Sequence, residues 1–212
     1  MPSERSIDPA DGAGGRAEGQ VRVAVLAGGM AARMGAAKAA VELCGRPLIS
    51  YPLAAAREAG LEPVVVAKRA SELPALRERV IHEPDRPHHP LCGIVAALRE
   101  RETAVVAVGC DMPFVSGALL RRIAGGAGGP GGALAARLDG RLQPLPARYT
   151  PADLPLLEDA LAGERSLRST LARLSPGVLD ERELRDLGVP ERLCFSVNDE
   201  RDLLRARRWL EG

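Results

Sequence analysis

The feature that most constrains the fold is a regular alternation of short apolar runs with longer amphipathic ones. The short runs, rich in Val, Ile and Ala, occupy residues 21–26, 63–67, 79–82 and 104–108. The run at 104–108 (AVVAV) is apolar throughout, as expected of a central strand covered on both faces. Helical patterns occupy residues 47–59, 93–101 and 116–124. This order predicts an α/β fold, a three-layer, Rossmann-like, mainly parallel sheet flanked by helices.

The second half of the chain begins with GGAGGPGG at residues 125–132, whose composition predicts a flexible connector. Apolar runs at 133–138 and 145–148 surround the turn Asp139-Gly140, which predicts a hairpin added to the sheet. The remaining pattern predicts helices at 152–162, 166–174 and 181–187, a final strand at 193–197 and a last helix at 199–209.

Length and composition narrow the class of protein. With 212 residues, we expect a single domain over residues 21–212 with a sizeable core. A net charge of +1 and an aromatic content of 2% argue against a nucleic-acid partner. No apolar stretch reaches membrane-spanning length, and residues 1–20 lack the apolar segment of a signal peptide. We therefore expect a cytoplasmic protein with a disordered leader, no membrane partner and four reduced cysteines.

The first apolar run leads into LAGGMAARMGAAK, which ends at Lys38. Because ligands of open parallel sheets bind beyond the carboxyl ends of the strands, the amides of Gly28 and Gly29 can hold an anion there. Arg33 and Lys38 add positive charge, and Lys38 is one of only two lysines in the chain. The spacing fits neither the Walker nor the dinucleotide pattern. Two interpretations stay open: a phosphate loop of another kind, or a glycine turn with solvated basic residues.

Two polar residues follow other predicted strands. Asp111 comes three residues after the run at 104–108. One carboxylate at this edge is the minimum that a Mg²⁺–triphosphate complex needs from a protein, whereas the alternative is an aspartate that caps a turn. Asn198 directly precedes the helix at 199–209, where it would make a good N-cap.

These motifs resemble those of a known family. LAGGMAARMGAAKAAVELCGRPLI at residues 26–49 is similar to the pattern LAGGxxxRMGxxK, followed by GxPLI, of the molybdopterin nucleotidylyltransferases. Similar motifs follow in the family's order, namely HPLCG (89–93), VGCDMPFV (108–115), RLQPLPARY (141–149), AGERSLRSTL (162–171) and FSVNDERDL (195–203). The resemblance covers about residues 20–210, and the double glycine looks more like the guanylyl-transferring branch.

The resemblance implies the nucleotide-diphospho-sugar transferase fold and a reaction. GMP would pass from GTP to the terminal phosphate of molybdopterin, with release of pyrophosphate. The N-terminal half would bind the nucleotide and the C-terminal half the acceptor. Mg²⁺ would be held by Asp111 and Asn198. Molybdate-insertion proteins and acceptor molybdoenzymes are implied as transient partners.

The same resemblance assigns the site residues. Lys38, helped by Arg33, would neutralise the leaving pyrophosphate, and Asp111 would act through the metal. Lys68 and Asp85 occupy positions that contact the nucleotide in the family, although Lys68 is also consistent with a solvated strand end. The nucleotide-binding set is Leu26, Ala27, Gly28, Gly29, Lys38, Lys68, Asp85 and Asp111.

Four positions depart from the family pattern, namely Ala37, His89, Cys92 and Ser196, the last in place of the first asparagine of the closing motif. Of these, Ala37, His89 and Cys92 bear on the substrates. Ala37 removes a carboxylate beside the phosphates, and the other two make the acceptor less certain than the nucleotide. His88 and His89 form a pair that could bind a metal, although a proline-rich loop favours an exposed turn. The alternatives are CTP-dependent cytidylyl transfer, transfer to another phosphorylated acceptor, and an inactive nucleotide-binding regulator.

Overall fold

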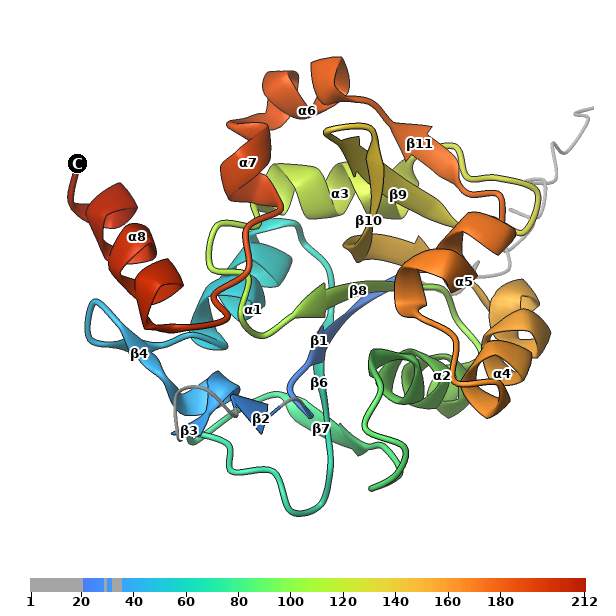
Figure 1. The fold of residues 1–212 in the computed structure, drawn as a ribbon, viewed down its shortest axis with the longest axis horizontal. Coiled ribbons are helices and arrows are strands. Elements are labelled where there is room, and N and C mark those ends of the chain that lie inside the picture. Colours follow the sequence, from blue (N-terminus) through green and yellow to red (C-terminus); the bar gives the residue numbers. More distant parts are fainter. Residues whose placement is uncertain (1–20, 29, 32–35) are drawn as a thin grey trace, which may run out of the picture.

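The computed structural model describes residues 21–28, 30–31 and 36–212. Its centre is a seven-stranded sheet in the order β11–β9–β10–β8–β1–β6–β7 (Figure 1). The strands are β1 (Arg22–Leu26), β6 (Pro63–Ala67), β7 (Arg79–His82), β8 (Val105–Gly109), β9 (Leu134–Leu138), β10 (Arg141–Tyr149) and β11 (Gly177–Leu179). β1, β6, β7 and β8 are parallel, and β10 runs antiparallel to both of its neighbours. The predicted mainly parallel sheet with an added hairpin is confirmed.

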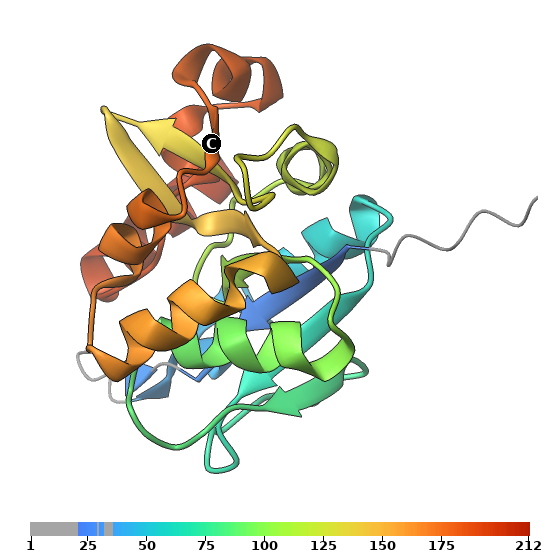
Figure 2. The same ribbon diagram turned by 90° about the vertical axis from the view of Figure 1, so that its right-hand side faces the viewer.

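Helices cover both faces of this sheet and make three layers. The helices are α1 (Ser50–Glu58), α2 (Pro90–Arg101), α3 (Gly117–Gly125), α4 (Leu154–Ala162), α5 (Leu167–Arg173), α6 (Glu181–Leu187), α7 (Pro190–Leu193) and α8 (Glu200–Glu211). α1 and α3 pack together on one face. α2 and α4 pack together on the other, where Figure 2 shows them side by side.

Short elements join these layers. Two small antiparallel ladders pair β2 (Met30–Ala31) with β3 (Ala36–Ala37) and β4 (Glu42–Leu43) with β5 (Arg46–Pro47). Two 3₁₀ turns, η1 (Lys38–Ala40) and η2 (Pro151–Asp153), precede β4 and α4. The predicted helix at 47–59 therefore begins later, at Ser50, because Pro47 pairs in β5.

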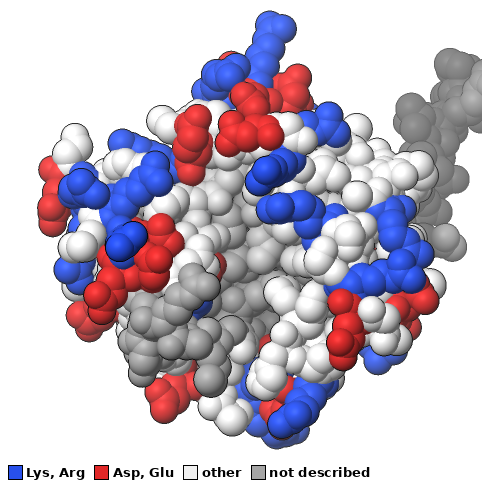
Figure 3. Space-filling model, viewed as in Figure 1, with Lys and Arg blue, Asp and Glu red and all other residues white. Residues whose placement is uncertain are grey.

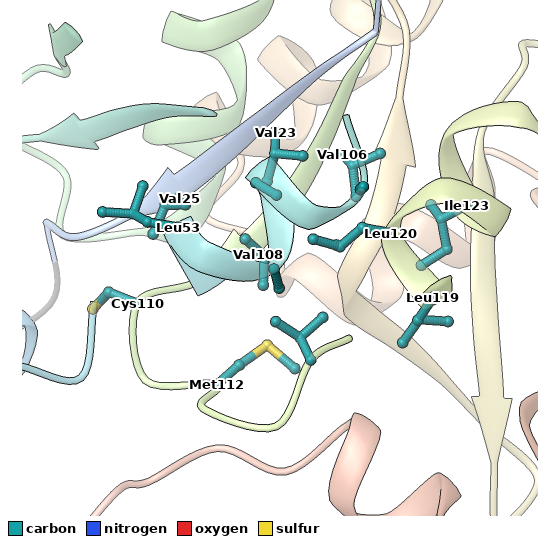
Figure 4. Packing of buried hydrophobic residues seen from close by; sticks show 14 of the residues in the cluster. Val23, Val25, Leu53, Val106, Val108, Cys110, Met112, Leu119, Leu120 and Ile123 are labelled. Atoms are coloured by element: carbon teal, nitrogen blue, oxygen red, sulfur yellow. The ribbon is translucent and has the colours of Figure 1, made fainter. Parts of the chain in front are cut away.

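The core explains why the central strands are apolar throughout. Val23, Val25, Val106 and Val108 lie on one face of the sheet and pack with residues of α1 and α3 (Figure 4). The intervening residues of the same strands pack on the opposite face, against α2. Since both faces of β1 and β8 are buried, neither strand has a polar side to alternate with its apolar one.

The predicted strand at 193–197 is wrong. Leu193 ends α7, and residues 195–198 have no regular secondary structure. Val197 is fully buried in a small cluster with Leu43 and Leu48, and its amide donates to the carbonyl of Asp111 (N···O 2.8 Å). The apolar pattern therefore reflects packing outside the sheet.

The glycine-rich stretch at 125–132 differs from the expected flexible connector. The guanidinium of Arg148 donates to the carbonyls of Ala124 and Gly132, and the amide of Gly129 donates to the carbonyl of Ala133 (N···O 2.8 Å). A Cβ atom at Gly129 would lie 1.9 Å from the carbonyl oxygen of Ser175. Glycine is needed here because two backbone segments approach closely.

This packing predicts that alanine changes the stability of the protein differently at two glycines of the same stretch. Gly129→Ala should lower the free energy of unfolding by about 1–3 kcal/mol, since the new methyl group meets backbone atoms that cannot move cheaply. Gly125→Ala is the control, because nothing lies within 4 Å of its added Cβ. Urea unfolding of both variants measures the difference, and equal stabilities would contradict a tightly packed connector.

Candidate active site

A crevice opens where the strand order reverses. From β1 the chain continues to β6 and β7 on one side, then returns to place β8 on the other side of β1. Such a switch point is where open α/β sheets bind ligands. A cavity of about 460 Å³ lies here, lined by Leu26, Gly28, Lys38, Lys68, Glu83, His88, His89, Pro90, Gly109, Cys110, Asp111 and Leu145. Figure 3 shows this face hollowed near its centre, where β8 ends in Figure 1.

Three predicted site residues meet at this edge. The ammonium of Lys38 donates to Oδ2 of Asp111 (2.8 Å) and to Oδ1 of Asn198 (3.0 Å). The side chains of Lys38 and Asp111 are only 16% and 17% exposed, so the ion pair is partly shielded from water. Residues from the loop after β1, the loop after β8 and the segment before α8 thus form one polar cluster.

The backbone around Asp111 is anchored on both sides of this residue. Its neighbours Cys110 and Met112 are buried in the core below (Figure 4), and the amide of Cys110 donates to the carbonyl of Leu26 (3.1 Å). With both neighbours anchored, Asp111 is held at the cavity. A Cβ atom at Gly109 would lie 2.3 Å from Oδ1 of Asp111, so glycine leaves the room that this carboxylate occupies.

Asn198 is held separately and is not the helix cap. Asp199 is the N-cap of α8, its side chain accepting from the amide of Asp202. The amide of Asn198 donates to Oδ2 of Asp202 (2.9 Å), and its Nδ2 donates to the carbonyl of Ser196 (3.1 Å). Because Asp199 does the capping, the Oδ1 atom of Asn198 is directed instead to Lys38.

An aromatic cluster anchors α8 beside the site. Phe114, Phe195 and Trp209 have ring centroids 4.9–6.1 Å apart, and the guanidinium of Arg205 lies 4.5 Å from the Trp209 ring centre. In a chain with 2% aromatic residues, three of them join α8 to the loop after β8. Aromatic contacts of this kind stabilise packing beyond the area they bury.

A second charged pair lies in the floor of the cavity. The side chains of Lys68 and Glu83 are 10% and 7% exposed, with Nζ 3.8 Å from Oε1. Burial raises the pKa of Glu83, and Lys68 opposes that rise. A Cβ atom at Gly28 would lie 1.8 Å from Oε1 of Glu83, so the glycine allows the carboxylate to lie against the first loop.

The Lys68 ammonium makes its hydrogen bonds with the backbone. Its ammonium donates to the carbonyls of Pro84 (2.7 Å) and Asp85 (2.9 Å), which fixes the loop before α2. Asp85 itself is exposed and does not line the cavity. Asp85 was predicted from the sequence and Glu83 was not, although an acidic residue directly after the strand at 79–82 was a usable signal.

The two histidines of the pair differ. His88 is exposed, whereas His89 caps α2, its Nδ1 accepting from the amide of Leu91 (3.1 Å). Burial lowers the pKa of His89. Since Nδ1 accepts a hydrogen bond, the proton of the neutral ring lies on Nε2, which makes that atom a donor.

The remaining predicted residues lie as follows. Leu26 and Gly28 line the cavity, whereas Ala27 is buried and its amide donates to the carbonyl of Val66 (2.7 Å). Gly29 and Arg33 lie outside the described residues. Ala37 ends β3, next to Lys38.

Neither a ready-made metal cluster nor a membrane span is present in the described part of the chain. There, no three His, Cys, Asp or Glu side chains converge as metal ligands. Likewise, no helix within those residues is both long and apolar enough to cross a bilayer.

The sequence is similar to those of known proteins. Residues 23–178 match the MobA-like NTP transferase domain. The chain is 34% identical to a probable molybdenum cofactor guanylyltransferase of Opitutus terrae over 79% of this chain and 84% of the relative. It is also 34% identical to the molybdenum cofactor guanylyltransferase of Pseudomonas putida over 81% of this chain and 94% of the relative.

Solved structures give the same result for the fold. Molybdopterin-guanine dinucleotide biosynthesis protein A from Archaeoglobus fulgidus superposes with a TM-score of 0.72 and 27% identity, covering 90% of this chain and 99% of that one. A 2-C-methyl-D-erythritol 4-phosphate cytidylyltransferase from Thermus thermophilus has a TM-score of 0.65 and 20% identity, covering 91% of this chain and 100% of that one. The second likeness concerns the fold alone.

The buried pair predicts a pH-dependent loss of stability in Lys68→Met. At pH 7 the variant should lose about 3 kcal/mol, because it leaves the Glu83 carboxylate buried without its counterion. Removing Lys68 raises the Glu83 pKa further in the folded state, so the folded protein binds a proton at higher pH than the unfolded chain. The cost is therefore present at high pH and shrinks as the pH falls and Glu83 protonates.

Urea unfolding of Lys68→Met and of Lys68→Met/Glu83→Gln between pH 5 and 8 measures this effect. The double variant, which has no charge at either position of this pair, should recover stability at pH 7 and lose the pH dependence of the deficit. A loss of stability in Lys68→Met that is the same at every pH would contradict an unpaired Glu83 charge as its cause. The cause would then be the lost hydrogen bonds from Lys68 to the loop before α2.

Proposed function

The chain belongs to the MobA-like NTP transferase family, and on that basis we propose that it transfers GMP from GTP to the terminal phosphate of molybdopterin, releasing pyrophosphate. The observation that carries the proposal is the meeting of Lys38, Asp111 and Asn198 at the switch point of the sheet. A cation and two oxygen ligands at this edge suit a triphosphate and its metal.

The chemistry of the oxygens fits Mg²⁺. Oδ2 of Asp111 and Oδ1 of Asn198 are hard donors, and both lie within hydrogen-bond distance of one cationic group, the Lys38 ammonium. Mg²⁺ commonly takes one or two protein oxygens and fills its other positions with phosphate and water. When bound, it would stabilise the charge of the phosphate oxygens at the reacting phosphorus.

The chain's own residues would act by position and charge. The acceptor phosphate is already an anionic nucleophile, so the reaction needs no strong general base. Gly28 would hold the triphosphate close to the backbone, with Gly29 and Arg33 proposed beside it. Lys38 would stabilise the charge that develops on the leaving pyrophosphate.

Glu83 provides a basis for guanine selection. Guanine presents two adjacent N–H donors on its Watson–Crick edge, and a carboxylate can accept both. Glu83 lines the cavity against Gly28 with its side chain nearly buried, and low exposure to water strengthens such contacts. Cytosine offers only its 4-amino group in the same way, so CTP is the second candidate.

The acceptor side rests on the family alone. We keep molybdopterin as the acceptor, the cytoplasm as the location, and molybdate-insertion proteins and molybdoenzymes as transient partners. Another phosphorylated acceptor, or an inactive nucleotide-binding protein, would be revealed by the following assay.

The test combines nucleotide binding and turnover. We expect GTP to bind more tightly than CTP in the presence of Mg²⁺, and molybdopterin to be converted with release of pyrophosphate. Asp111→Asn should lower turnover at least about a hundredfold, because the metal loses its charged ligand. Asp159→Asn, on the exposed face of α4, is the control for a change of one carboxylate. Full activity in Asp111→Asn would contradict the proposed metal site.

Glu83→Gln should remove the preference for guanine. GTP affinity should fall about tenfold or more because one acceptor becomes a donor, while ATP affinity changes little. Burial raises the Glu83 pKa, so wild-type selectivity should decline as the pH falls through that raised pKa. Calorimetric titration with GTP and ATP between pH 5 and 8 measures both effects. A GTP:ATP ratio that is the same in both proteins would place base recognition elsewhere.

A further inference from the structure

We propose that Lys38 is an internal counterion of the metal site, whose ammonium covers the two oxygen ligands until a triphosphate draws it away. The inference rests on the proposed function, since it concerns the same metal and nucleotide. It goes further because it gives Lys38 a role before any substrate is bound and fixes the order in which ligands enter.

The lysine and the metal would use the same oxygen atoms, those of Asp111 and Asn198. The ammonium of Lys38 donates to Oδ2 of Asp111 (2.8 Å) and Oδ1 of Asn198 (3.0 Å), the oxygens proposed as metal ligands. The other lysine, Lys68, donates to backbone carbonyls and faces Glu83. Among the described residues that line the cavity, Lys38 is therefore the cation at this edge. A divalent ion on the same oxygens would lie beside an ammonium group and be repelled by it.

The residues that carry these oxygens are held in place without the lysine. Asp111 is held by its buried neighbours, and its carbonyl accepts from the amide of Val197 (2.8 Å). Asn198 is held by Asp202 and by the carbonyl of Ser196. Removing the Lys38 side chain should therefore leave both oxygens in place and without a counterion, rather than collapse the site.

Only the lysine side chain has to move for the two oxygens to become free. The next residue, Ala39, is 1% exposed and anchors the 3₁₀ turn in the core. The ammonium lies at the end of a flexible four-carbon stem, so it can leave the oxygens while the backbone stays fixed. A triphosphate offers it stronger acceptors nearby, in the same cavity.

The competition between lysine and metal predicts the order in which metal and nucleotide bind. In the free protein the lysine competes with the metal, so the affinity for metal alone is reduced by the fraction of time that the oxygens are covered. A metal–triphosphate complex brings its own negative charge and relieves the competition. The metal should therefore enter with the nucleotide rather than ahead of it.

The experiment is calorimetric titration of the nucleotide-free protein with Mn²⁺ alone, a stand-in for Mg²⁺. Lys38→Met should bind Mn²⁺ on the order of tenfold more tightly than wild type. The substitution would thus raise the affinity for metal although it removes a group proposed to act in catalysis. Lys38→Arg keeps the charge and is the matched control, with affinity near that of wild type. Adding Asp111→Asn to Lys38→Met should abolish this gain in Mn²⁺ affinity, which would place the ion at the Asp111 carboxylate. Thermal melting of each variant confirms that it is folded.

The outcomes separate this inference from the proposed function. Equal or weaker Mn²⁺ binding by Lys38→Met, or no binding by either protein, overturns the counterion role. A gain that survives Asp111→Asn also overturns it, since the ion is then elsewhere. A parallel titration of the wild type with GTP and Mg²⁺ tests the proposed function on its own. GTP binding without the Lys38→Met gain would reject only the inference, whereas no GTP binding would reject the proposed function.

Discussion

β1 is hydrogen-bonded by parallel neighbours on both sides, and this pairing determines where each part of the site lies. Leu26, at its end, is in register with Val66 of β6 and Gly109 of β8. The loops that leave these three strands must therefore begin at the same edge of the sheet. The first carries Lys38, the second Lys68 and the third Asp111. The site follows from the strand order, because parallel strands bring their carboxyl ends together.

Each buried charge near this edge has a partner, and the partners have different consequences. Lys68 and Glu83 are both nearly buried, and Lys68 also fixes the loop before α2, so this pair stabilises the cavity wall. Lys38 and Asp111 are more exposed, and neither donates to nor accepts from the backbone through its side chain in the described contacts. The first pair is thus tied to the backbone, whereas the side chains of the second form hydrogen bonds, among the described residues, only with each other and with Asn198. Low exposure makes both pairs stronger than surface ion pairs.

Much of the fold was predictable because it depends on local patterns. The apolar runs of β1, β6 and β8 gave the parallel sheet, and Asp139-Gly140 gave the hairpin. Lys38 and Asp111 could be selected because they follow such strands. The errors share another origin. The apolar residues at 193–197 pack outside the sheet, and the glycines at 125–132 allow contact with Ser175, distant in sequence. Glu83 was missed because its burial depends on Gly28, which approaches it only in the folded chain.

The hydrogen bond between Lys38 and Asn198 joins residues that are 160 positions apart. During synthesis on the ribosome, the seven strands are all translated by Leu179, well before α8 emerges. Every strand of the sheet therefore precedes the asparagine in the sequence, and the cluster at the switch point depends on one of the last residues to be added. The cluster is completed only when the last helix docks through its aromatic side chains. A chain that stops before Asn198 would contain all seven strands of the sheet and still lack one of the three members of the cluster.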